Sequence, residues 1–214
     1  MLESLKKRKK RAEEINTIFK RIYKNADCTL NYNGAFQLLI ATQLAAQCTD
    51  ERVNKVTPAL FSKYPDAFAF ANADLFELME DIKSTGFFRN KAKNIIACSK
   101  LLLEKYNGEV PDDLDELLAL PGVGRKTANL VLGDFFGIPG IVVDTHASRL
   151  SYRMGLTDKK EPYKIELDLM ELLPPCEWSN FCHRLVYHGR EYCNARRPKC
   201  DDCPIASLCP KCVF

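Results

Sequence analysis

The sequence predicts an all-α fold, and three observations lead to this prediction. Apolar residues recur at the i, i+3, i+4 and i+7 spacing of an amphipathic helix along nearly the whole chain. Only Gly140–Val143 has a composition typical of a strand, and it is too short and too isolated to build a sheet. The candidate helices follow one another through short loops, without a low-complexity linker or an internal repeat.

Each expected helix has an apolar face, and most have a recognisable start or stop signal. They are expected through residues 15–23 and over residues 33–47, 49–64, 90–106, 113–120, 125–136 and 178–191. Thr49 can cap the third of these helices, and Pro58 is expected to kink or break it. Gly108 suits the exit of the fourth. A further helical pattern begins at His146.

Charge and length limit the class of protein. The 214 residues carry a net charge of only +3, so binding to nucleic acid has to come from local basic patches. The N-terminus has no apolar core of a signal peptide. The longest apolar stretch, Phe36 to Ala46, is too short and too polar to span a bilayer. We therefore expect a cytoplasmic protein, nucleoid-associated if it is bacterial or archaeal, with no membrane partner.

The cysteines are unevenly distributed. Four of the ten fall within residues 193–209, with the spacing C-x6-C-x2-C-x5-C, and in a reducing compartment this pattern favours a metal centre over disulfides. The four candidate ligands are Cys193, Cys200, Cys203 and Cys209. The spacing by itself fits zinc and an iron–sulfur cluster about equally well. The six others, residues 28, 48, 98, 176, 182 and 212, are interpreted as core or surface thiols.

The segment LLALPGVGRKTAN, residues 117–129, predicts a helical hairpin. Pro121 cannot continue a helix comfortably, and Gly122 and Gly124 allow a tight turn with exposed backbone N–H groups. A second helix then starts near Arg125. Backbone donors beside a positive helix N-terminus form a phosphate site, which would hold a DNA backbone without reading its sequence. The alternative is a plain helical hairpin with a glycine turn.

Lys126 lies in the first turn of that second helix. Roughly one free lysine in 2,500 is neutral at pH 7, and both partial burial and a helix N-terminus favour the neutral form. We expect partial burial here, which would suit a nucleophilic amine. The alternative is a lysine that binds phosphate beside Arg125.

Asp144 follows a short apolar run and precedes a helical pattern. It can act as a helix N-cap, and it can also stabilise an oxocarbenium-like sugar electrostatically or deprotonate a water. Both roles can hold, because a capping carboxylate is fixed in place and kept ionised.

These motifs together resemble one family. LPGVGRKTAN, followed 18 residues after its lysine by the aspartate of VDTH-x-x-R, is similar to the endonuclease III branch of the helix-hairpin-helix DNA glycosylase superfamily. The resemblance covers roughly residues 10 to 210. It implies that Lys126 is the nucleophile that attacks C1′ of a flipped, damaged nucleoside. It also implies that Asp144 is the essential carboxylate, and that a Schiff base then undergoes β-elimination and nicks the strand.

The resemblance extends to the cysteines and to two loops. The cysteine spacing matches the family's [4Fe–4S] loop, which selects the cluster over zinc. Three cations on that loop, Arg196, Arg197 and Lys199, are expected to contact DNA phosphates, with a solvated polar loop as the alternative. Gln47, within the family's A-Q-x-T-D segment, would fill the gap left by the flipped base. Phe87 would wedge the opposite strand, although a core aromatic is an equal alternative.

The implied architecture has two lobes. A six-helix barrel lobe over residues 28–138 would hold the hairpin, and residues 1–27 would join 139–214 in a cluster lobe, with the active site in the cleft between them. The implied function is removal of oxidised pyrimidines from damaged double-stranded DNA by a monomer with abasic-site lyase activity. Gln43 agrees with this, since adenine-excising relatives have a catalytic Glu there. The rivals are a monofunctional glycosylase and a non-enzymatic iron–sulfur DNA-binding module.

Overall fold

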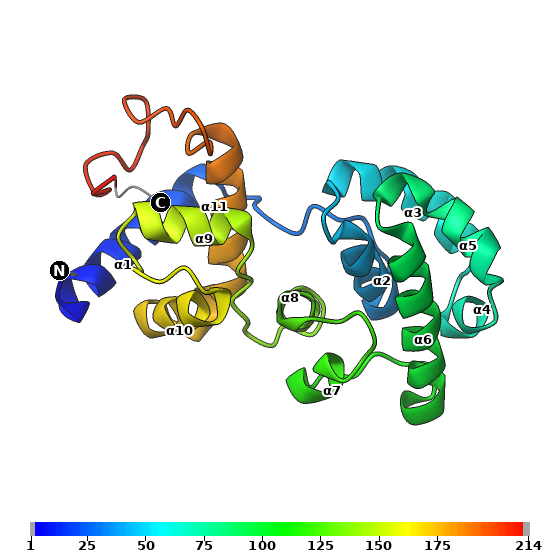
Figure 1. Cartoon of the computed structure of the whole chain (residues 1–214). Coiled ribbons are helices and arrows are strands. Elements are labelled where there is room, and N and C mark those ends of the chain that lie inside the picture. The colour runs from blue at the N-terminus through cyan, green and yellow to red at the C-terminus, as the bar shows by residue number, and fades with distance from the viewer. Residues whose placement is uncertain (1–2, 212–214) are drawn as a thin grey trace. The chain divides into compact units, whose positions relative to one another are not determined.

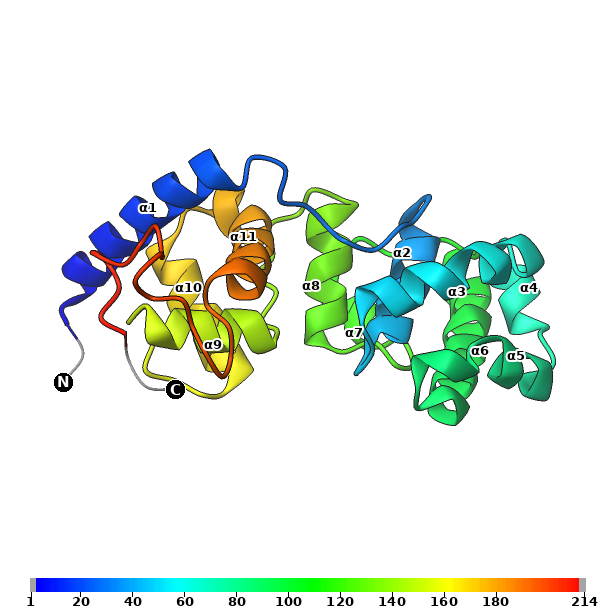
Figure 2. The same cartoon turned by 90° about the horizontal axis from the view of Figure 1, so that it is seen from above.

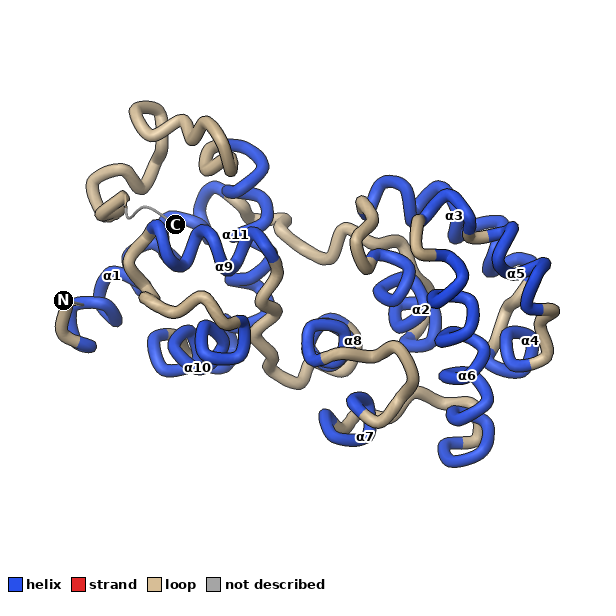
Figure 3. Tube along the Cα trace, viewed as in Figure 1, coloured by secondary structure: helices blue, strands red, loops and turns tan. Residues whose placement is uncertain are grey.

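The computed structural model describes residues 3–211, and within that range every regular element is a helix. Figure 3 shows these helices joined by loops, with no strand between them in the described part of the chain. The all-α prediction is therefore confirmed. The chain divides into two compact units, one formed by Cys28–Ile138 and the other by Met1–Asp27 together with Pro139–Phe214.

The unit Cys28–Ile138 combines long helices with several short ones (Figure 1). Its elements are α2 (Ala35–Ala45), α3 (Asp50–Lys63), α4 (Ala67–Ala71), α5 (Leu75–Asp81), the 3-10 helix η1 (Lys83–Thr85), α6 (Phe88–Tyr106), α7 (Leu114–Leu118) and α8 (Arg125–Asp134). Helix α2 is buried on all sides from Leu38 to Leu44, and it packs against α3, α6 and α8.

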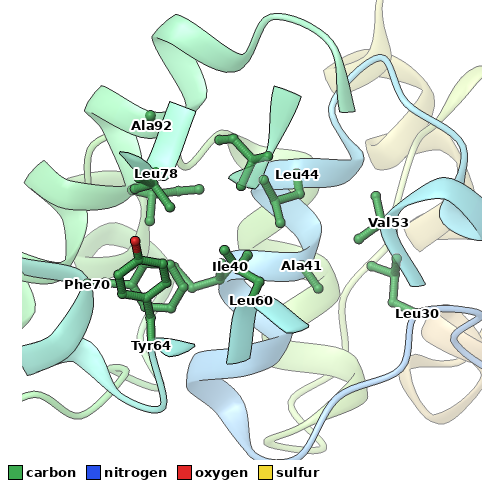
Figure 4. Close-up of a cluster of buried hydrophobic side chains, with 12 residues drawn as sticks. Leu30, Ile40, Ala41, Leu44, Val53, Leu60, Tyr64, Phe70, Leu78 and Ala92 are labelled. Carbon is green, nitrogen blue, oxygen red and sulfur yellow. The ribbon is translucent and has the colours of Figure 1, made fainter. Parts of the chain in front are cut away.

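The core of this unit surrounds α2. Ile40 and Leu44 of α2 are fully buried in a cluster with Tyr64, Phe70 and Leu78, which Figure 4 shows as sticks. Burying one such side chain stabilises the fold by about 1.5–3 kcal/mol. The unit therefore has a hydrophobic core of its own that can hold its loops in place.

The other unit joins the two ends of the chain. Its elements are α1 (Leu5–Ile22), α9 (Thr145–Arg153), α10 (Pro162–Leu172), the 3-10 helix η2 (Pro175–Glu177) and α11 (Trp178–Glu191). Helix α1 packs against α10 and α11 (Figure 2), and its Phe19 ring stacks on Phe181 at 6.1 Å. The Arg8 guanidinium donates a hydrogen bond to the Leu156 carbonyl at 3.1 Å. These contacts fix the N-terminal helix to the second half of the chain.

Several helix boundaries follow their local signals. Thr49 caps α3 as predicted, because its hydroxyl accepts a hydrogen bond from the Arg52 N–H at 3.3 Å. Helix α11 has the predicted bounds. Of the kink or break expected at Pro58, the break does not occur, since α3 continues through the proline as one helix. Val53, Thr57 and Leu60 are buried on both sides of the proline, and this packing holds the two halves together.

Helices α4, α5 and α10 were not among the predicted elements. Each carries a start signal in the sequence: Asp66 caps α4, Asp74 caps α5, and Pro162 is the first residue of α10. Residues 140–143 form no strand. No helix between residues 3 and 211 is long and apolar enough to cross a membrane.

Candidate functional site

The segment around residues 113–134 forms the predicted hairpin (Figure 1). Asp113 caps α7 by accepting hydrogen bonds from Asp115 N–H at 2.8 Å and Glu116 N–H at 3.1 Å. Helix α8 then begins at Arg125, where the second helix was expected. Gly122 has a φ of +77°, a conformation that L side chains rarely adopt. The tight glycine turn is confirmed.

The two glycines of the turn have different surroundings. A Cβ on Gly122 would lie 2.8 Å from Asn94 Cβ and 2.9 Å from Gln43 Oε1, so there is no room for a side chain at this position. A Cβ on Gly124 would meet nothing within 4 Å. Gly124 is the N-cap of α8 and offers no side chain there, which leaves the positive end of the helix open to an anion. Gly122 is needed because a side chain would not fit there, and Gly124 is needed because it leaves the N-terminus of α8 accessible to an anion.

Lys126 is the second residue of α8, as predicted, but its side chain is exposed. The expected partial burial is therefore wrong. The reason is its position on α8, because Ala128, Val131 and Leu132 form the buried face of this helix. Lys126 does stand in the first turn of α8, as expected. An exposed amine is also open to a large substrate such as a nucleic acid strand.

Asp144 is the N-cap of α9, and its Oδ1 accepts a hydrogen bond from the Ala147 N–H at 2.7 Å. The carboxylate is half-buried and held at the positive end of a nine-residue helix. The predicted capping role of Asp144 is confirmed, and a capping carboxylate can also have a catalytic role.

The other end of α9 holds the cysteine loop. The Arg153 guanidinium donates hydrogen bonds to the carbonyls of Asn194, at 2.7 Å, and Ala195, at 2.8 Å. Arg149 donates to the Cys193 carbonyl at 3.1 Å and also contacts His146 Nδ1 at 3.2 Å. Sequence reasoning used Arg149 only as part of a motif and missed Arg153. Their signal is the spacing of four, which places both on one side of a helix.

The four candidate ligands Cys193, Cys200, Cys203 and Cys209 line one cavity of about 250 Å³. All four are half-buried free thiols. Within residues 3–211, no group of three or more His, Cys, Asp or Glu side chains could hold a metal ion directly. Four thiols lining one cavity are a donor set that suits either a zinc ion or an iron–sulfur cluster.

His188, from α11, connects that cavity to the core of its unit. It is buried, with Nδ1 3.1 Å from the Tyr23 hydroxyl and Nε2 3.5 Å from Cys203 Sγ. His188 therefore faces both the core of its unit and the cysteine loop. The loop cations Arg196, Arg197 and Lys199 are all exposed. Cys212 lies outside the described residues.

Gln47 and Phe87 both have left-handed backbones, with φ of 53° and 48°. Such a conformation is strained for a residue with a side chain. Gln47 is exposed and Phe87 is 63% exposed, so the alternative of a core aromatic at position 87 is wrong. Sequence reasoning missed Lys91, which is 6% exposed and donates hydrogen bonds to the Leu44 and Thr85 carbonyls. The signal for it was its place four residues before Ile95, on the apolar face of the helix.

Comparisons with known proteins identify the family to which this chain belongs. The profile of the HhH-GPD superfamily base excision DNA repair proteins matches residues 40–175. The endonuclease III of Synechocystis sp. is 55% identical over 211 residues, which cover 98% of this chain and 96% of that protein.

Two solved structures are similar over nearly the full length. One is a non-covalent endonuclease III–DNA complex and the other a trapped endonuclease III–DNA covalent intermediate. Each has a TM-score of 0.92 and 44% identity, and the match covers 99% of this chain and 97% of that chain. This chain therefore belongs to the endonuclease III family, within the HhH-GPD superfamily of base excision DNA repair proteins.

Proposed function

We propose that this chain removes oxidised pyrimidines from damaged double-stranded DNA and then cleaves the abasic site by β-elimination, with Lys126 as nucleophile and Asp144 as the essential carboxylate. The observation that carries this proposal is the exposed lysine at the second position of α8, directly after the glycine turn. A similar endonuclease III has been trapped as a covalent DNA intermediate, which is the species that a nucleophilic mechanism requires.

The reaction begins when the neutral Lys126 amine attacks C1′ of the damaged nucleoside. The bond from C1′ to the base breaks, and the base leaves with the electron pair and takes up a proton. Ring opening then gives an imine between Nζ and C1′. Loss of a proton from C2′ expels the 3′ phosphate and nicks the strand, and water finally hydrolyses the imine and releases the lysine.

Asp144 contributes charge at a fixed place. Its hydrogen bond to the Ala147 N–H holds the carboxylate in one orientation. Such a preorganised anion stabilises positive charge that develops on the sugar as the base leaves, and it can accept a proton afterwards. Removing one group of this kind costs a factor of roughly 100 to 1,000 in rate.

The protein binds DNA in two ways: the hairpin turn contacts the phosphate backbone, and two side chains are inserted into the duplex. The turn with Gly122, Gly124 and Arg125 presents backbone donors and a cation to one phosphate region. Gln47 fills the gap left by the flipped nucleotide, and Phe87 wedges the opposite strand. Flipping costs a few kcal/mol of pairing and stacking, so two inserted side chains help to hold the opened state.

The cysteine loop supplies a second surface that contacts the DNA backbone. The thiolates of Cys193, Cys200, Cys203 and Cys209 would hold a [4Fe–4S] cluster, which when bound fixes the fold of the loop. The exposed cations Arg196, Arg197 and Lys199 on that loop contact phosphates without reading sequence. We expect the enzyme to act as a monomer, located with the genome.

Borohydride trapping tests the proposal. Wild-type protein mixed with a thymine-glycol duplex and borohydride should become covalently linked to DNA, because the reductant converts the imine to a stable amine. Lys126→Gln should not be linked, and its nicking should be slower by at least about a thousandfold. Lys93→Gln is the matched control, since Lys93 is also an exposed lysine near the start of a long helix of the same unit.

The rivals predict different results. A monofunctional glycosylase would release the base without becoming linked, and a non-enzymatic DNA-binding module would release no base at all. Equal trapping of Lys126→Gln and wild type would overturn the assignment of the nucleophile.

A further inference from the structure

Lys91 is a buried ammonium group with two backbone acceptors. Its Nζ donates hydrogen bonds to the Leu44 carbonyl at 2.7 Å and to the Thr85 carbonyl at 2.9 Å. Burial lowers the pKa of Lys91. A buried cation is costly unless it is well hydrogen-bonded, so these two contacts are the reason that it is tolerated.

The two carbonyls belong to different elements. Leu44 is in the last turn of α2, where helical carbonyls lack partners within the helix and the helix end is negative. Thr85 is the last residue of η1. Lys91 itself belongs to α6, and its backbone N–H donates to the Phe87 carbonyl at 3.1 Å. One residue thus connects the ends of three elements.

The last turn of α2 and the 3-10 helix η1 are each followed by an exposed residue with a strained backbone. Gln47 is three residues beyond Leu44, and Phe87 is two residues beyond Thr85. Both have left-handed backbones, which persist only where the surrounding structure holds them. The Lys91 hydrogen bonds are the direct link between the segments that carry these two residues.

We propose that Lys91 is a positioning residue that fixes the spacing of Gln47 and Phe87, so that the two side chains enter a duplex together. This inference rests on the proposed function of those residues. Opening a base pair requires one side chain in the gap and one against the opposite strand at the same time. The end of α2 and the end of η1 are both hydrogen-bonded to the Lys91 ammonium group. A shift of one of these segments would therefore strain its hydrogen bond and be opposed by the contact to the other segment.

The test compares duplex with single-stranded substrate. The rate of cleavage at one abasic site is measured in a duplex and in the same single strand, and the readout is the duplex-to-single-strand ratio. Lys91→Met keeps the length of the side chain and removes both hydrogen bonds. A misplacement of about 1 Å can cost a factor of 100, so we expect the ratio to fall at least about tenfold.

Lys93→Met is the matched control, because it removes a positive charge two residues away on the same helix, from an exposed side chain. It should leave the ratio within about twofold of wild type. Coupling is tested by adding Lys91→Met to the double variant Gln47→Ala/Phe87→Ala, where it should lower the ratio by less than about twofold. Merely structural damage would lower both rates and leave the ratio unchanged.

The outcomes distinguish a failure of the insertion roles of Gln47 and Phe87 from a failure of the positioning role of Lys91. If Gln47→Ala and Phe87→Ala themselves leave the ratio unchanged, the insertion roles are wrong and this inference is wrong with them. If those variants lower the ratio and Lys91→Met does not, only the positioning role of Lys91 is wrong. Should Lys91→Met fail to fold, as judged by circular dichroism, Lys91→Arg replaces it, because it keeps the charge but changes the reach. An unchanged ratio for that variant would overturn the inference.

Discussion

Replacing Gly122 by alanine should destabilise the protein far more than the same change at Gly124. Two costs add at position 122. A left-handed backbone, here with φ +77°, costs an alanine about 1–2 kcal/mol. The new Cβ would lie 2.8 Å from Asn94 Cβ, and overpacking of this kind costs about 1–3 kcal/mol. The expected loss is therefore about 2–5 kcal/mol, or roughly 6–15 °C in melting temperature at about 3 °C per kcal/mol.

Gly124→Ala provides the contrast. Its backbone is extended, with φ −101°, and the added methyl would meet nothing within 4 Å. Its stability should fall by about 1 kcal/mol or less, because alanine is a poorer helix N-cap than glycine. The methyl would nevertheless stand at the open N-terminus of α8, where a phosphate is expected to bind, so affinity for an abasic-site duplex should fall.

The assay is thermal unfolding of both variants by circular dichroism, with binding measured by fluorescence anisotropy on the same samples. The reasoning is refuted if Gly122→Ala melts within about 2 °C of wild type, or if Gly124→Ala loses as much stability as Gly122→Ala.

Three further predictions follow from the second unit and the core. Asp144→Asn should keep the cap of α9, because Asn and Asp cap about equally well; single-turnover excision should nevertheless fall by about 100-fold or more, and an unchanged rate would exclude a catalytic carboxylate. Arg153→Met removes the hydrogen bonds to the Asn194 and Ala195 carbonyls, so iron bound per chain and affinity for DNA should both decrease, whereas full iron content would contradict the holding role. Burial raises the pKa of Cys98 from 9.0 to about 11, so the folded state keeps this proton when the unfolded chain has lost it. Stability is then complete below about pH 9 and falls as pH rises toward 11, by up to about 1.4 kcal/mol per pH unit, and urea unfolding of Cys98→Ala should lack this slope.

Local chemistry made much of the fold predictable from the sequence. The hairpin turn depends on Pro121 and two glycines, and α3 starts where Thr49 can cap it, so these features need no knowledge of distant residues. The effect of Pro58 on α3 could not be predicted from the local sequence, because it depends on which neighbouring side chains are buried. Turn and capping residues thus made the starts of α3 and α8 predictable, but the short helices α4 and α5 were missed although Asp66 and Asp74 cap them.

The candidate site shows the same division. The residue types at positions 126 and 144 were sufficient to single them out, but the exposure of Lys126 depends on which face of α8 packs against the rest of its unit. The burial of Lys91 likewise depends on carbonyls 47 and 6 residues away in the chain. Exposure and long-range hydrogen bonds are properties of the assembled unit, and a single sequence carries them only indirectly.

Helix α9 acts as a spacer of fixed length. An α-helix rises 1.5 Å per residue and hardly stretches, so nine residues keep its two ends about 13 Å apart. The Asp144 carboxylate is attached at one end, and the arginines that hold the backbone after Cys193 lie toward the other. The acidic group and the backbone that begins the cysteine loop are thus held at a set separation by a single helix within one unit.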